Sequence, residues 1–164
     1  MLPSKLAGAA YEKLSFAGRV EDDVAGGDVC SYFCPGELSA YAKGIGMTSG
    51  PMTIALAFPA DTTAPTGAFI RVVRLAGQGV GADALVRSWI GHADTKERRV
   101  LGQGTVRSGG KQLSWTAVGS PTDPLFLTYL YARDDTLFII NARPAPDDPN
   151  VPGPLLEETF RSLP

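Results

Sequence analysis

The chain has few of the side chains on which hydrolases and metal proteins depend. Its 164 residues contain one histidine, His92, and two cysteines, Cys30 and Cys34. A Ser-His-Asp triad would have to use His92 as its base. That histidine follows the apolar stripe of an expected helix, where histidines commonly interact with the last carbonyl groups. Since no Gly-x-Ser-x-Gly string is present either, the composition favours a non-catalytic protein.

Strong charge and long apolar runs are also missing. The net charge is −2 and the pI is about 5.3, whereas nucleic-acid-binding domains usually have a pI above about 9. No apolar run approaches the roughly 18 residues that a transmembrane helix needs. The sequence therefore predicts neither a nucleic-acid partner nor a membrane-spanning helix, and it suggests no cofactor.

Glycine and proline are abundant instead, with 19 and 13 residues. Both residue types favour turns, so the composition indicates many short strands. The length suits a single domain over 1–164. Apolar spacing within it predicts helices at 4–14, 82–91 and 155–163, and strands at 15–24, 52–58, 68–75, 98–107, 111–119, 125–132 and 136–142.

These elements predict an α+β fold. We expect an antiparallel sheet of about six strands, with an N-terminal, a central and a C-terminal helix packed on it. Residues 25–50 show no clear pattern. Residues 144–154 contain five prolines and are expected to run extended over the surface.

Four stretches of the second half resemble small domains of the PsbP and DcrB type. They are ADALVRSWI, SGGKQLSWTAVG, LFLTYLYARDDTLFIINAR and LLEETFRSLP, in the order helix, hairpin, hairpin, helix. The last contains Phe160-Arg161-Ser162, which is similar to the Ser-Phe motif of that family. The resemblance implies an extracytoplasmic, often lipoprotein, accessory or assembly factor, and it carries over no catalytic residues.

Cys30 and Cys34 form the first candidate site. In an exported protein this pair would form a structural disulfide, and in a reducing compartment it would remain as two thiols. The Cys-x-x-x-Cys-Pro string is also similar to the copper motif of Sco-type assembly proteins, which implies a soft-metal or redox site. In that interpretation His92 supplies a third ligand, with Met47 or Met52 as alternatives.

A second candidate site is the glycine-rich stretch Gly77–Ala82. It fits G-x-G-x-x-A between an expected strand and an expected helix, so the helix N-terminus is suited to bind a phosphate. Glu97 follows at the spacing of a ribose-binding acid. A βαβ series is missing, however, so a simple strand-to-helix turn is the favoured explanation of the glycines. Acidic clusters are interpreted as solvated turns; they are Glu21-Asp22-Asp23 with Asp28, Asp134-Asp135 and Asp147-Asp148.

The functional hypothesis is a non-catalytic module of the cell envelope that binds a protein or a small molecule on its sheet. An extracytoplasmic location is expected over a cytoplasmic one, and it would imply that a signal peptide or a membrane-tethering segment was removed from the N-terminus. A thiol-dependent copper or redox factor and a nucleotide-binding enzyme are the alternatives.

Overall fold

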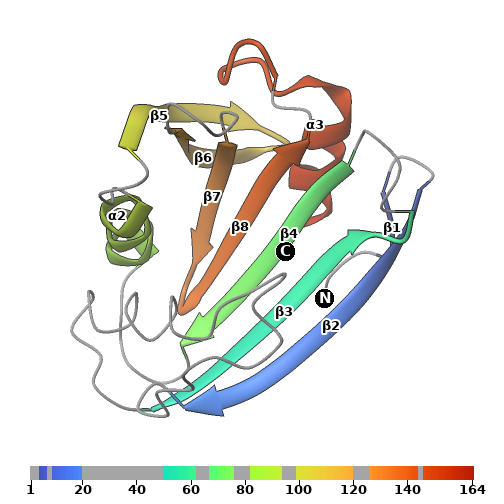
Figure 1. Ribbon diagram of the computed structural model, residues 1–164, viewed down its shortest axis with the longest axis vertical. Helices are drawn as coiled ribbons and strands as arrows, with labels where there is room; N and C mark the ends of the chain where they lie inside the picture. Colours follow the sequence, from blue (N-terminus) through green and yellow to red (C-terminus); the bar gives the residue numbers. More distant parts are fainter. Residues whose placement is uncertain are drawn as a thin grey trace.

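The computed structural model describes residues 4–6, 9–19, 50–61, 67–75, 82–93, 99–119, 126–143 and 146–164 (Figure 1). Within these ranges there are eight strands and two helices. The strands are β1 (Lys5–Leu6), β2 (Ala9–Arg19), β3 (Pro51–Pro59), β4 (Gly67–Leu75), β5 (Arg99–Ser108), β6 (Lys111–Gly119), β7 (Phe126–Arg133) and β8 (Thr136–Arg143). The helices are α2 (Ala82–Ala93) and α3 (Gly153–Ser162).

The strands form one sheet in the order β1-β2-β3-β4-β8-β7-β6-β5, with every neighbouring pair antiparallel. Two meanders make it up, one running from β2 to β4 and the other from β5 to β8. Helix α2 lies between them in the sequence. The chain therefore passes from β4, in the middle of the sheet, to β5 at its edge, and then returns strand by strand until β8 pairs with β4.

The predicted architecture is wrong at the N-terminus and in its strand count. Residues 4–14, expected as a helix, belong largely to β1 and β2, and β2 pairs with β3 from Tyr11↔Pro59 to Arg19↔Pro51. The expected helix rested on Leu6, Ala10 and Leu14. A spacing of four residues also fits a strand, because four is a multiple of the strand period of two. The sheet has eight strands rather than six, so the fold is β-rich instead of α+β with three helices.

The local pattern identified the other elements well. Helices form at α2 and α3, in α3 with a proline in the first turn, and strands form the two hairpins β5–β6 and β7–β8. These segments have strict periods and strong turn residues, so neighbours in the sequence are enough to specify them.

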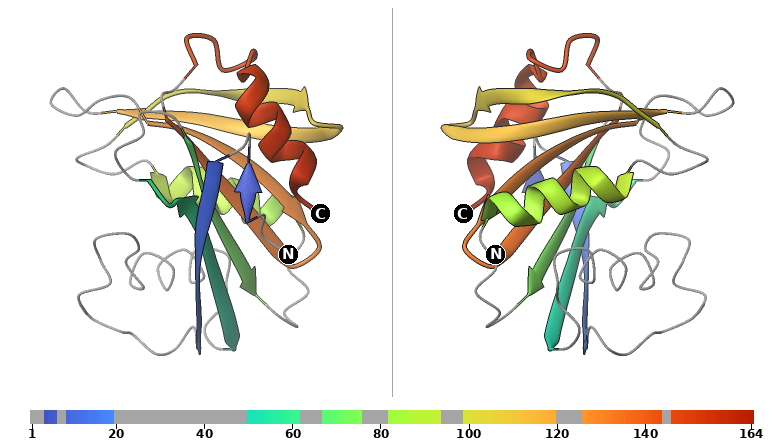
Figure 2. Two further views of the ribbon diagram at one scale, coloured as in Figure 1. Left: turned by 90° about the vertical axis from the view of Figure 1, so that its right-hand side faces the viewer. Right: turned by 90° about the vertical axis from the view of Figure 1, so that its left-hand side faces the viewer.

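The two helices lie on opposite sides of the sheet, with α2 against β7 and β8 and α3 on the other side (Figure 2). On the α3 side, Ile70, Ile140 and Tyr129 lie opposite one another on neighbouring strands and are fully buried. Phe160 of α3 packs edge-on against Tyr129, with ring centroids 5.1 Å apart. On the α2 side, the fully or almost fully buried side chains include those of Leu130, Leu137 and Ile139.

The β5–β6 turn is fixed against α3. Gly109 and Gly110 have φ of +57° and +80°, which is the geometry of a type I′ turn and favours glycine. A Cβ on Gly109 would lie 2.6 Å from the backbone nitrogen of Arg161, whereas a Cβ on Gly110 would meet nothing within 4 Å. Gly109 thus allows the hairpin to touch the last turn of α3.

We expect Gly109→Ala to destabilise the fold more than Gly110→Ala. Both changes force an L-residue to positive φ, which costs about 1–2 kcal/mol. Only the first also pushes the hairpin away from α3, which adds about 1–3 kcal/mol. Urea unfolding of the two variants measures the difference, and equal losses would show that the turn is not packed on the helix.

Candidate functional site

Most of the residues proposed from the sequence lie outside the described ranges. This applies to Cys30, Cys34, Met47, Glu97, residues 77–81 and the acidic group at 21–23 and 28. Met52 lies in β3, Ala82 begins α2 and His92 lies near its end, but their side chains are not among those described. The thiol, copper and nucleotide interpretations therefore stay predictions. In the described ranges, no three His, Cys, Asp or Glu side chains are grouped to hold a metal ion.

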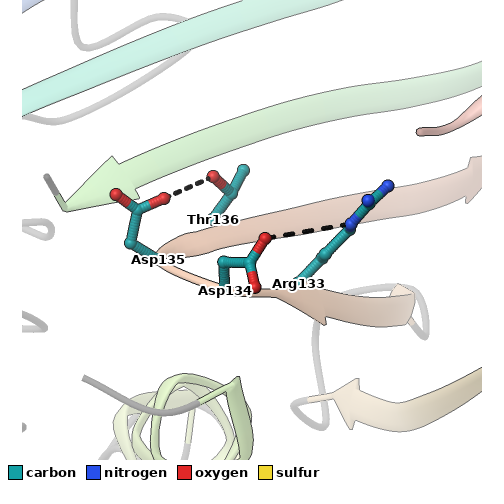
Figure 3. Close-up of polar contacts among 4 residues, drawn as sticks. All are labelled: Arg133, Asp134, Asp135 and Thr136. Carbon is teal, nitrogen blue, oxygen red and sulfur yellow. Dashed lines mark hydrogen bonds and ion pairs between the residues drawn. The ribbon is translucent and has the colours of Figure 1, made fainter. Parts of the chain in front are cut away.

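Two acidic pairs are described, and their contacts are those of turns. Asp134 has φ of 53° in the β7–β8 turn, and its carboxylate is 3.9 Å from Arg133 Nε. The carboxylate of Asp135 accepts a hydrogen bond of 3.0 Å from the hydroxyl of Thr136 (Figure 3). In the second pair, Asp148 Oδ1 accepts a bond of 2.8 Å from the backbone N–H of Asn150. These contacts of Asp134, Asp135 and Asp148 are thus with residues one or two positions away in the same turn.

The proline-rich segment is anchored to the core by Tyr129. The hydroxyl of this buried tyrosine donates a 2.8 Å hydrogen bond to the carbonyl of Pro149. The chain turns back at Asp148, whose carbonyl accepts from the N–H of Val151 at 2.9 Å, so it does not run extended throughout. Burial and, to a lesser extent, the charge of Asp148 raise the pKa of Tyr129 to about 12. The tyrosine hydroxyl is therefore protonated at neutral pH and serves to hold the segment.

Stability should fall above pH 10 because of Tyr129. An unfolded tyrosine has a pKa near 10, so between about pH 10 and 12 the unfolded chain loses a proton that the folded chain keeps. The contribution of the tyrosine is fully present below this range and is lost as the pH rises through it. We expect Tyr129→Phe to cost about 1 kcal/mol at neutral pH and to flatten the alkaline decline. Denaturant unfolding of both proteins between about pH 10 and 12 measures how the free energy of unfolding depends on pH. An identical pH dependence in the two proteins would contradict the role given to Tyr129.

A buried polar row crosses the α2 face of the sheet without forming a site. Thr116 and Thr128 are opposite each other on β6 and β7, and Thr128 is opposite Asn141 on β8. The Thr116 hydroxyl makes no hydrogen bond in the structure, and less than 1 Å² of its oxygen is exposed.

Strand β5 presents an unpaired edge. It ends the sheet, and no described segment pairs with its outer side. A bulge interrupts its ladder between Val100 and Gly102, and the unpaired Leu101 is 65% exposed. From Gly102 to Ser108 the register with β6 is regular.

The turn geometry determines which backbone groups of β5 point outward. In a two-residue type I′ hairpin, the residues flanking the turn form a hydrogen-bonded pair, here Ser108 and Lys111. Bonded and non-bonded pairs then alternate along the strands. The N–H and C=O groups that point away from β6 are therefore those of Gln103, Thr105 and Arg107.

Trp115 lies across this edge strand. Trp115 is directly opposite Gly104 in the register, and a Cβ on Gly104 would lie 2.9 Å from three indole atoms. A Cβ on Gly102 would lie 3.4 Å from the same ring. The indole N–H donates to Asn150 Oδ1 at 3.3 Å, which connects the ring to the proline-rich segment. Two residues without side chains thus let an aromatic ring cover β5 and reach the boundary of the sheet.

We expect Gly104→Ala to displace the Trp115 ring and Gly102→Ala to leave it in place. The first methyl group would overlap the ring, which costs about 1–3 kcal/mol, while the second makes ordinary contact. Near-ultraviolet circular dichroism reports the tryptophan environment, and thermal unfolding reports the stability. If both variants behaved alike, the ring would not lie over Gly104.

The outer hairpin is positively charged although the chain as a whole is not. Residues 99–119 contain three basic side chains and no acidic one; the basic residues are Arg99, Arg107 and Lys111. Arg99 and Arg107 are exposed, and neither makes an ion pair with a described residue. The Lys111 ammonium lies 5.6 Å from the centre of the Tyr131 ring. The open edge therefore combines unpaired backbone groups, an aromatic ring and positive charge.

Comparison with protein-family models, with curated proteins and with solved structures found no match. The resemblance to PsbP and DcrB domains accordingly stays a prediction. In the described ranges, no helix is long and apolar enough to cross a membrane.

The sequence predicts the β5–β6 hairpin, but it does not indicate that the edge of this hairpin is a candidate site. Strand order depends on pairing between distant segments, which local spacing does not encode. One signal was present in the sequence: two glycines in alternate positions of β5, opposite a strand that carries a tryptophan. Isolated glycines within a strand often mark a close approach of another group.

Proposed function

We propose that this protein is a non-catalytic binding domain that takes up an extended segment of a partner protein along the outer edge of β5. The observation that carries the proposal is the outward set of backbone groups at Gln103, Thr105 and Arg107. Strand addition to such an edge is a common mode of peptide recognition, in which backbone hydrogen bonds supply affinity and side-chain contacts supply specificity.

The residues around the edge of β5 support the proposal that this edge binds a partner and is not merely exposed to solvent. Natural edge strands are blunted by charge and bulges, which prevent uncontrolled pairing, and β5 has both. Beyond the bulge, however, seven residues keep a regular ladder, which is longer than a typical protected edge. Trp115 adds an aromatic contact, and tryptophan is enriched among the residues that dominate binding energy.

An extracytoplasmic accessory role, with or without a membrane tether, is part of this proposal. It rests on the resemblance to PsbP and DcrB domains and on the spacing of Cys30 and Cys34. A partner protein is favoured over a small molecule because the described groups form an open edge.

The proposal is tested by removing one of the backbone N–H groups that point away from β6. Thr105→Pro removes an N–H that points away from β6, and proline is tolerated on edge strands at such positions. Thr105→Val keeps the N–H and is the matched control. The probe is the neutral peptide Thr-Gln-Thr-Val-Phe-Val-Thr, and two-dimensional NMR of the labelled protein follows the backbone amides.

We expect the peptide to shift the amide signals of β5 in the native protein and in Thr105→Val, and not in Thr105→Pro. A folded Thr105→Pro protein that binds the peptide as well as the control would overturn the proposal, as would shifts confined to other strands. Circular dichroism spectra of both variants establish that the sheet is retained.

A further inference from the structure

The two ends of the regular part of β5 carry different features, a positive charge and an aromatic ring, and together these indicate which partner segment would fit. Near the turn, Arg107 is exposed and has no ion-pairing partner among the described residues. Three residues earlier, Gly104 has no side chain, and the Trp115 ring lies against the position that its Cβ would occupy. Residues three apart in a strand face opposite sides of the sheet, so the charge and the ring lie on different faces.

The pairing geometry places one partner residue next to each feature. Gly104 is hydrogen-bonded toward β6, so on its outer side it would form a non-hydrogen-bonded pair. In such pairs the Cα atoms are closest, about 4.5 Å apart, and the side chains touch. A residue opposite Gly104 would therefore lie against the indole of Trp115. The residue opposite Arg107 would face the guanidinium across a hydrogen-bonded pair.

Charge distinguishes among the possible occupants. A second copy of this chain would bring an equally basic hairpin, and like charges across a strand pair are destabilising. Among the described residues, the carboxylate of Asp148 lies near the Trp115 end of this edge, because it accepts a hydrogen bond from Asn150, whose amide oxygen accepts from the Trp115 indole. Negative charge on a partner is thus favoured at the Arg107 end and disfavoured at the Trp115 end.

We infer that the segment bound at β5 runs antiparallel to it, with an acidic side chain opposite Arg107 and an apolar one opposite Gly104, three residues later. The inference rests on the proposed strand addition at this edge. The antiparallel direction follows the rest of the sheet, in which every pair is antiparallel, and antiparallel pairs are slightly more stable per residue.

The test uses three peptides that differ at one position. The first is Thr-Glu-Thr-Val-Phe-Val-Thr, and the other two carry Gln or Lys in place of Glu at the second position. When the phenylalanine lies opposite Gly104, this second residue lies opposite Arg107. Dissociation constants come from isothermal titration at low salt. Each peptide is titrated into the native protein and into the Arg107→Glu and Arg99→Glu variants. Arg99→Glu is the control, because Arg99 is exposed on the same strand but lies on the other side of the bulge.

For the native chain, we expect the Glu peptide to bind about two- to fivefold more tightly than the Gln peptide, and the Lys peptide to bind correspondingly more weakly. Arg107→Glu should reverse this order, and Arg99→Glu should preserve it. Binding should also change the tryptophan emission, because the peptide phenylalanine would lie against the Trp115 indole. Replacing this phenylalanine by serine should weaken binding several-fold and abolish that change.

The two proposals fail in different ways. If all three peptides shift the β5 amides with equal affinity, or if Arg99→Glu reverses the order as well, the acidic partner is wrong while strand addition stands. If none of the peptides shifts the β5 amides, strand addition itself is wrong.

Discussion

The buried ring of Tyr129 connects the parts of the structure on which the binding edge depends. It lies on β7, two strands in from β5, opposite Ile140 on one side and Trp115 on the other. Its face is closed by Phe160 of α3, and its hydroxyl holds the carbonyl of Pro149. The same proline-rich segment then supplies Asn150 to the indole of Trp115. One aromatic core residue thereby links the C-terminal helix, the segment before it and the ring that covers β5.

The order of the strands explains why the edge lies at β5. A simple meander of the last four strands would put β8 at the boundary, but β8 pairs with β4 on its outer side. The strand reached after α2 therefore forms one of the two ends of the sheet, β1 being the other, and in the described part of the chain nothing pairs with its outer side. It carries a bulge, two arginines and two glycines, which limit indiscriminate pairing and leave the backbone of 102–108 regular. An edge protected in this way favours partners with complementary charge over further copies of itself.

The sequence predicted the elements with strong local signals and failed where distant pairing decides. The Ser108-Gly109-Gly110 turn and the apolar stripe of α2 each specify their own structure, because their residues interact within a few positions. Leu6, Ala10 and Leu14 fit a helix and a strand equally, and pairing with β3 resolved the ambiguity. The candidate edge was beyond prediction for the same reason, since Trp115 and Gly104 meet only after the hairpin has formed. The sites that the sequence did suggest, at Cys30, Cys34 and Gly77–Ala82, are still predictions.

The central claim is that β5 has an open edge with alternating outward backbone groups. Amide hydrogen exchange of the free protein, resolved by residue, tests it most directly, because inward N–H groups are protected by the ladder and outward ones are not. We predict rapid exchange at Gln103, Thr105 and Arg107, and slow exchange at Gly104 and Val106. Uniform protection from 103 to 107 would contradict the account, because another segment would then already occupy the edge.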